Sequence, residues 1–187
     1  DSAAACPRDL VKRHFVADHP NRLWVADFTY VSTWQGWLYV AFVIDAYAKR
    51  IVGWRASGSM TTDFVLDALE QAVYDRRPSE SDGLIHHSDR GAQYVSIRYS
   101  DRLSEAGINP SVGSTGSAYD NALAETINGL YKTEVIPRRA PWKTKAAVGL
   151  ATLDWVSWFN HQRLLPSIGD LPPAATDDRD IAPLEAT

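Results

Sequence analysis

The apolar run from Trp37 to Ile44 most constrains how this chain can fold. The run (WLYVAFVI) is almost unbroken, and Asp45, Lys49 and Arg50 follow it too closely for it to span a membrane. A strand with one face in water alternates apolar and polar residues, so an unbroken run of this length indicates a strand buried on both faces. The chain is therefore expected to contain a sheet with packed layers on both sides.

Two further strands flank this run. Residues 23–31 are rich in β-branched and aromatic residues and contain neither Gly nor Pro, and residues 50–56 have a similar character. Short turns at residues 32–36 and 45–49 separate the three segments. Strands joined by such tight turns form an antiparallel meander.

The hydrophobic period then changes to that of a helix, which Thr61 or Thr62 can cap. A short strand is expected at residues 84–87, a helix near residues 95–106 and a fifth strand at residues 108–112. This order predicts an α/β fold with a five-stranded mixed sheet, three antiparallel strands followed by two parallel ones, flanked by helices.

A Gly-rich loop follows at residues 113–116. Residues 117–120 (SAYD) are typical of a capping box that begins the next helix. Pro137 and Pro141 separate that helix from a last one at about residues 142–159.

One domain is expected, because 187 residues suffice for one sizeable α/β core but not for two. Residues 1–21 are irregular and polar and are interpreted as a linker. Residues 22–173 form the predicted core. Residues 174–187 show no periodicity and are expected to be a loosely ordered tail.

The composition favours an intracellular protein. Cys6 is the single cysteine and cannot form an internal disulfide, and residues 1–7 lack a basic region followed by an apolar stretch. A reducing compartment and no membrane association are therefore expected.

The net charge of −4 argues against a nucleic-acid partner, because DNA affinity normally comes from clustered Lys and Arg. The charge is uneven, however. Residues 131–145 carry five basic residues and only Glu134 as an acid. Acids that later bind cations would also contribute to the negative balance.

Two aspartates stand where acids are locally unfavourable or where ligand sites gather. Asp27 lies in the middle of an apolar strand, where an unpaired carboxylate is costly. Asp89 directly follows the fourth predicted strand, at the kind of strand end where α/β proteins bind ligands. Taken singly, each has a simple structural explanation, as a hydrogen-bonded carboxylate and as a turn residue.

Glu125 lies on the helix predicted after residue 117. It faces away from the apolar stripe of that helix, at about 100° of rotation per residue. A polar stripe shares its side, and an ordinary solvated helix face would explain this equally well. The apolar stripe is Leu123, Ile127, Leu130 and Tyr131, and the polar one is Asn121, Asn128 and Lys132.

The three acids form a pattern when they are taken together. Sixty-one residues separate Asp27 from Asp89, and 35 separate Asp89 from Glu125. A strand Asp, a post-strand Asp and a helix Glu with that last gap resemble the DD(35)E integrase core of bacterial insertion-sequence transposases of the OrfB type, which are related to retroviral integrases. The resemblance covers about residues 23–173. It is carried by WVADFTY (24–30), VID (43–45), IVGW (51–54), HSDRGAQY (87–94), YDNA (119–122), KTE (132–134), FN (159–160) and Arg163.

Some positions depart from the family pattern. Phe159 stands where the family usually has Tyr, and Leu165 where it often has His. Neither affects the acidic triad. The helix-turn-helix region expected upstream in the bacterial enzymes is absent from this sequence, so the chain is interpreted as part of a longer transposase.

The resemblance implies a ribonuclease-H-like fold and a site with two divalent ions, Mg²⁺ or Mn²⁺, bound by carboxylate oxygens. Asp27 would bridge the ions, while Asp89 and Glu125 would each hold one. Carboxyl groups with ordinary pKa values near ~4 should be ionised at pH 7. Water would first release a 3′-hydroxyl at the element end, and that hydroxyl would then attack a second phosphodiester.

The resemblance also implies partners. DNA contacts are expected from Lys132, Asn121, Asn128, Arg90, Asn160 and Arg163, although Lys132 could equally be an exposed helix lysine, and Asn160 and Arg163 could simply cap the last helix. A homo-oligomer in the active complex and a bacterial cytoplasmic, nucleoid-associated location are expected by analogy. The alternatives are a ribonuclease-H-type nuclease without strand transfer and a non-catalytic DNA-binding or assembly module.

Other polar and aromatic residues are assigned structural roles. Asp45 stands at a strand end before a turn and is expected to have a structural role, with a minor metal role left open. Adjacent His86 and His87 should point to opposite faces of their strand, with only His87 able to touch the site. Trp155 and Trp158 are expected in the core or at an interface.

Overall fold

The computed structural model describes residues 6–114, 120–136 and 142–181. Within them the sheet has five strands in the order β3-β2-β1-β4-β5. Strand β1 is antiparallel to β2 and parallel to β4, β2 is antiparallel to β3, and β4 is parallel to β5. The predicted mixed sheet is therefore confirmed. The strands are β1 (Leu23–Thr33), β2 (Gly36–Asp45), β3 (Arg50–Ser57), β4 (Ile85–Ser88) and β5 (Asn109–Val112).

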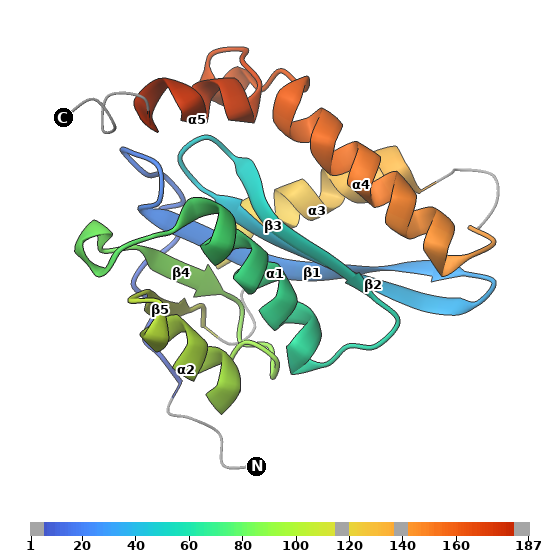
Figure 1. The fold of residues 1–187 in the computed structure, drawn as a ribbon, viewed down its shortest axis with the longest axis horizontal. Coiled ribbons are helices and arrows are strands. Elements are labelled where there is room, and N and C mark those ends of the chain that lie inside the picture. Colours follow the sequence, from blue (N-terminus) through green and yellow to red (C-terminus); the bar gives the residue numbers. More distant parts are fainter. Residues whose placement is uncertain (1–5, 115–119, 137–141, 182–187) are drawn as a thin grey trace.

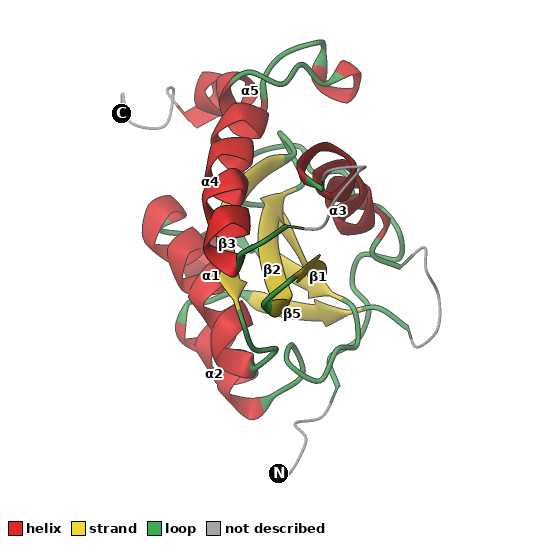
Figure 2. Ribbon diagram, turned by 90° about the vertical axis from the view of Figure 1, so that its right-hand side faces the viewer, coloured by secondary structure: helices red, strands yellow, loops and turns green. Residues whose placement is uncertain are grey.

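Helices cover both faces of this sheet, as the apolar second strand predicted (Figure 1). Helices α1 (Thr62–Arg76) and α2 (Ile97–Glu105) lie on one face, and α3 (Ala122–Val135) and α4 (Lys145–His161) pack on the other. Figure 2 shows α1 and α2 on the opposite side of the strands from α3. Two short 3₁₀ turns, Glu80–Asp82 and Pro166–Ile168, and α5 (Pro173–Ile181) complete the described elements.

Each face of the sheet has its own hydrophobic core because side chains alternate along the strands. On β1, Trp24 and Ala26 point toward α1 and α2, while Leu23 and Val25 point toward α3 and α4. Helix α1 approaches β3 so closely that a Cβ atom on Gly53 would lie 2.1 Å from a backbone oxygen of α1. This close approach requires a glycine at that position.

The predicted helix starts are partly correct. Thr61 is the N-cap of α1, but its side chain makes no capping hydrogen bond. Helix α4 begins three residues later than expected, at Lys145, because Thr144 caps it by accepting a hydrogen bond from the Ala147 N–H. Residues 115–119 lie outside the described ranges, and they include half of the predicted Gly-rich loop (113–116) and three of the four residues of the predicted capping box (117–120).

Helix α5 lies where the sequence predicted a tail without regular structure. A buried ionic cluster accounts for this difference. Asp177 accepts hydrogen bonds from Arg50 (2.7 Å) and Arg76, and Arg76 also donates to Asp45 at 3.1 Å. Both aspartates are fully buried, so these pairs anchor α5 beside β3. The expected structural role of Asp45 is confirmed.

None of the helices within the described residues is both long and apolar enough to cross a membrane.

Candidate active site

The pairing of β1 with β4 brings the two aspartates together. Ala26 of β1 is in register with Ser88, the last residue of β4, and Asp27 and Asp89 are the next residues of the two parallel segments. Alternation turns both side chains toward the face covered by α3. Adjacent strands lie about 4.8 Å apart, so the two carboxylates lie close together where β4 ends beside β1.

Two asparagines link the helix that carries the third acid to β1. The side-chain amide of Asn121 donates to the carbonyl oxygen of Ala26 (3.0 Å), and that of Asn128 donates to Oδ2 of Asp27 (2.9 Å). Glu125 lies four residues after Asn121 and three before Asn128, on the same face of α3. The helix thus presents Glu125 between two anchor points that both reach β1 at or next to Asp27.

The electrostatics of Asp27 agree with this arrangement. Its pKa is raised from 3.8 to about 7, first by burial and then by the negative charge of Asp89. A hydrogen bond from the Phe28 N–H opposes this rise, the charge of Glu125 adds to it, and the Asn128 hydrogen bond opposes it. Without a cation, Asp27 therefore keeps its proton to a higher pH than an exposed aspartate does, whereas the predicted ionisation at pH 7 assumed an ordinary pKa and bound metal.

The donor set around Asp27 fits a hard divalent cation. Its acidic groups are all carboxylates, the ligands that Mg²⁺ prefers. The side-chain oxygens of Asn121 and Asn128 are also buried without a hydrogen-bond partner. Among the described residues, however, no three His, Cys, Asp or Glu side chains gather tightly enough to hold one ion.

The turn after β4 shapes the position of Asp89. The N–H of Gly91 donates to Oδ1 of Asp89 (3.0 Å), and a Cβ atom on Gly91 would lie only 3.1 Å from that oxygen. The Tyr94 ring is buried nearby, and its pKa is raised well above 10 by burial and then by surrounding negative groups, including Asp27 and Asp89. Arg90 is exposed at the surface of this turn.

Asp120 is an organising residue that sequence reasoning missed. It is buried, it accepts hydrogen bonds from the N–H and hydroxyl of Ser114, and it pairs with Arg13 at 2.8 Å. Its backbone oxygen receives a hydrogen bond from Nε2 of His87 (2.7 Å), whose Nδ1 lies 2.8 Å from the Ser111 hydroxyl. Since Asp120 directly precedes the N-cap of α3, these contacts fix the start of the helix that carries Glu125. In the sequence, the available signal for this role was that an acidic residue stands immediately before Asn121 at the start of the predicted helix.

The two histidines have separate roles. His86 lies on the α2 side and its Nε2 is 2.8 Å from the Tyr99 hydroxyl, so the predicted packing role is confirmed. Burial lowers the pKa of His86 to about 3. His87 lies on the opposite face, as predicted, but it contacts Asp120 rather than the three acids.

The residues expected to contact DNA separate into two groups. Lys132 and Arg90 remain at the surface near the acids, with Nζ of Lys132 lying 4.8 Å above the Tyr30 ring. Asn121 and Asn128 are buried and direct their amide N–H groups to β1. These two asparagines position the site, and a DNA contact is no longer needed to explain them.

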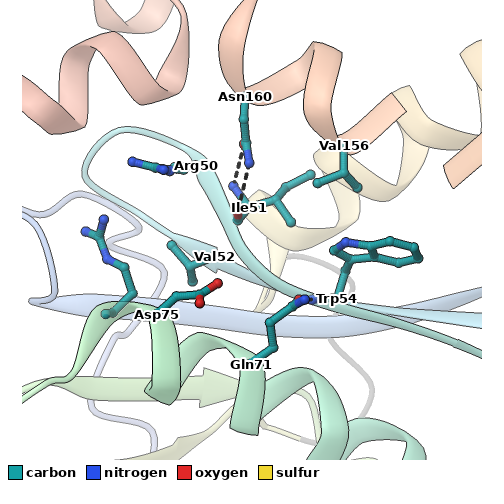
Figure 3. Close-up of a pocket in the computed structure, with 9 residues that line it drawn as sticks. Arg50, Ile51, Val52, Trp54, Gln71, Asp75, Val156 and Asn160 are labelled. Atoms are coloured by element: carbon teal, nitrogen blue, oxygen red, sulfur yellow. Dashed lines mark hydrogen bonds between the residues drawn. The ribbon is translucent and has the colours of Figure 1, made fainter. Parts of the chain in front are cut away.

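Asn160 and Arg163 bind other parts of the fold, away from the three acids. Figure 3 shows the Asn160 amide binding both the N–H and the carbonyl oxygen of Ile51, each at 2.9 Å, on the edge strand β3. The pocket in that view contains none of the three acids. Arg163 pairs with Glu134, which also accepts a hydrogen bond from the Trp155 indole. Trp155 is buried, as expected.

Comparisons with known proteins agree with this architecture. The integrase core domain family matches residues 17–118, and a second family of the same description matches residues 106–173. A Mycobacterium tuberculosis protein named as a transposase for insertion sequence element IS986/IS6110 is 61% identical over 176 residues, 92% of this chain and 63% of that protein. The transposase for element IS629 of Shigella sonnei is 61% identical over 174 residues, 93% of this chain and 57% of that protein. The chain thus spans about three fifths of the length of these curated relatives.

Retroviral integrases are among the solved structures with a similar fold. One chain of a simian T-cell lymphotropic virus intasome, in complex with a PP2A regulatory subunit, superposes with a TM-score of 0.71 at 17% identity, covering 95% of this chain and 60% of that one. The HTLV-2 integrase catalytic core domain in complex with magnesium gives a TM-score of 0.64 at 14% identity, covering 86% and 98%. The predicted ribonuclease-H-like fold is therefore confirmed, and the chain belongs to the integrase core domain family.

Proposed function

We propose that this chain is the catalytic core of an insertion-sequence transposase, which hydrolyses DNA phosphodiesters at element ends and joins the freed 3′-hydroxyls to other DNA. The observation that carries this proposal is that the charges of Asp89 and Glu125 both act on Asp27, which also accepts a hydrogen bond from Asn128 on the helix of Glu125. A partly buried carboxyl beside two like charges is disfavoured as an anion unless a cation neutralises it. Such a cluster is well suited to binding divalent metal.

In this proposal the carboxylates of Asp27, Asp89 and Glu125 would hold two Mg²⁺ or Mn²⁺ ions. Two bound ions supply stabilisation for the attacking and leaving oxygens of a phosphodiester. Asn128 holds the Asp27 carboxylate in a fixed orientation, and Asn121 ties the start of α3 to β1.

DNA is the proposed substrate. Lys132 lies two turns along α3 from Glu125 and Arg90 directly follows Asp89, so both cations can contact phosphates that flank the reacting one. The retroviral relatives include an intasome and a dimeric form, which favours a homo-oligomer in the active complex. Action on bacterial DNA implies a cytoplasmic location at the nucleoid.

A strand-joining assay tests this function. A labelled duplex copied from the DNA flanking the chain's own gene is incubated with a target plasmid and Mg²⁺. We expect nicking of the duplex and a labelled plasmid product, both lost in Asp89→Asn and both retained in Asp101→Asn, which changes an exposed acid on α2.

The other outcomes separate the alternatives. Nicked duplex without joined plasmid indicates a nuclease that only hydrolyses. Products that are unchanged in Asp89→Asn would contradict the catalytic assignment of the site.

A further inference from the structure

Three large aromatic side chains are exposed together on the β1–β2 hairpin. Tyr30 is 50% exposed, Trp34 at the turn 68% and Trp37 50%. The rings of Tyr30 and Trp37 are in edge-to-face contact, with centroids 5.1 Å apart. In Figure 1 this hairpin extends beyond the body of the sheet at the end away from β4. Clustered exposed rings are characteristic of a binding surface.

Lysines surround these rings. Nζ of Lys132 lies 4.8 Å above the Tyr30 ring, and Nζ of Lys143 lies 5.7 Å from the centre of the Trp34 ring. The backbone N–H of Lys145 donates to the side chain of Gln35 in the hairpin turn (3.0 Å), which places a third lysine at the same end. We call the six residues the aromatic hairpin surface: Tyr30, Trp34, Trp37, Lys132, Lys143 and Lys145.

The hairpin and the segment that carries Lys143 and Lys145 lack acids. The sequence contains no Asp or Glu from residue 28 to residue 44, nor from residue 135 to residue 153. A chain with a net charge of −4 therefore concentrates positive charge here, next to exposed rings. Rings flanked by cations match a single nucleic-acid strand, because bases stack on the rings while ammonium groups meet the phosphates.

The aromatic hairpin surface adjoins the candidate active site. Tyr30 follows Asp27 by three residues of strand, about 10 Å, and points to the opposite face of the sheet. Lys132 follows Glu125 by seven residues of helix, also about 10 Å, on the same face of α3. Lys132 on α3 and Tyr30 on β1 are in contact, so the strand and the helix that carry the acids meet again at this surface. At about 3.4 Å of duplex axis per phosphate of one strand, this separation corresponds to roughly three base pairs of a duplex.

We propose that the aromatic hairpin surface binds unpaired bases of the DNA strand, a few nucleotides from the phosphate that is cut. The proposal rests on the proposed function and adds to it a substrate feature, an opened or frayed DNA end. Stacking on Tyr30, Trp34 and Trp37 holds the strand after its bases separate from their complement. Lys143 and Lys145 neutralise the phosphates of that strand.

Binding of labelled oligonucleotides in EDTA tests the surface independently of catalysis. A fluorescein-labelled single strand and the matching duplex are titrated with the 187-residue chain and followed by anisotropy. We expect Trp34→Ala and Trp37→Ala each to weaken single-strand binding by about fivefold or more, with a smaller effect on the duplex. Tyr74→Ala is the matched control, since Tyr74 is 74% exposed on α1 and lies outside the surface.

A second readout follows the tryptophans directly. Stacked bases quench indole fluorescence, so the single strand should quench the native chain and quench the Trp34→Phe, Trp37→Phe double variant much less. Circular dichroism of every variant verifies that the fold is retained.

Equal single-strand binding by the native chain and both alanine variants overturns the proposal. The same holds if the variants keep their DNA affinity but lose self-association in light scattering, because the surface then contacts protein. Loss of strand joining in Asp89→Asn with retained single-strand binding separates the two proposals. Absence of joining in the native chain refutes the proposed function but leaves the binding result intact.

Discussion

Replacing Asp27 with Asn should stabilise the metal-free domain at high pH. Folding raises the pKa of Asp27 from 3.8 to about 7, so the folded state binds this proton more tightly than the unfolded state. The free energy of unfolding therefore falls as pH rises from about 4 to about 7 and stays lowered above that range. Three pH units at about 1.4 kcal/mol each give a loss of about 4 kcal/mol.

The variant removes this loss but also one hydrogen bond. Asp27 accepts from the Phe28 N–H and from the Asn128 amide, and an Asn at this position offers one oxygen to those two donors. The missing bond costs about 1 kcal/mol at every pH. Asp27→Asn should therefore be more stable than the native chain by about 3 kcal/mol at pH 8 and within about 1 kcal/mol of it at pH 5.

Urea unfolding in EDTA at pH 5 and pH 8 measures both differences, with Asp101→Asn as the control for an exposed acid. Adding Mg²⁺ at pH 8 should stabilise the native chain and leave Asp27→Asn unchanged, because a bound cation replaces the proton on Asp27. A stability difference that is the same at both pH values would contradict this prediction, because it would mean that folding does not raise the pKa of Asp27.

Three further perturbations test the surroundings of the site. Asn128→Ala removes a hydrogen-bond donor that favours the ionised form of Asp27, so metal binding, which competes with the proton, should require a higher pH. Mn²⁺ titrations at a series of pH values measure the pH midpoint of binding, and a midpoint equal to that of the native chain would contradict this prediction. Asp120→Ala should lower the rate of strand cleavage by about tenfold or more while shifting the melting temperature little, because it loosens the start of α3; equal rates would show that the contacts of Asp120 do not position Glu125. Asp177→Ala leaves Arg76 buried without its main partner and should lower the free energy of unfolding by about 3 to 5 kcal/mol in urea, whereas a change below 1 kcal/mol would show that α5 is not held by this pair.

The sheet could be predicted from the sequence because its signals are local. The unbroken run after Gly36 requires burial on both faces, and the tight turns on either side of it fix antiparallel pairing with its neighbours. Helix ends were less predictable, since a side chain such as Thr144 decides them by a single capping bond. Helix α5 could not be foreseen, because the ion pairs of Asp177 link it to residues more than 100 positions away.

The three acids could be proposed as one site because their spacing resembles that of the family, although each acid alone has a simple structural explanation. The environment of these acids could not be predicted from the sequence. The raised pKa of Asp27 comes from burial and from charges that only the folded sheet brings near it. Asn121 and Asn128 were expected to face DNA, yet each amide is turned to β1, a distinction that a helical polar stripe cannot make. The network around Asp120 joins segments distant in sequence and left no periodic signal.

Calorimetry of Mn²⁺ binding to the native chain and to Asp27→Asn, Asp89→Asn and Glu125→Gln tests whether the three acids form one metal site. We expect the native chain to bind Mn²⁺, Asp27→Asn to weaken binding most because Asp27 would contribute to both ions, and each of the other two variants to weaken it in part. Asp101→Asn should bind like the native chain. Equal Mn²⁺ affinity in the native chain and in all three site variants would contradict the claim that these carboxylates form one metal site.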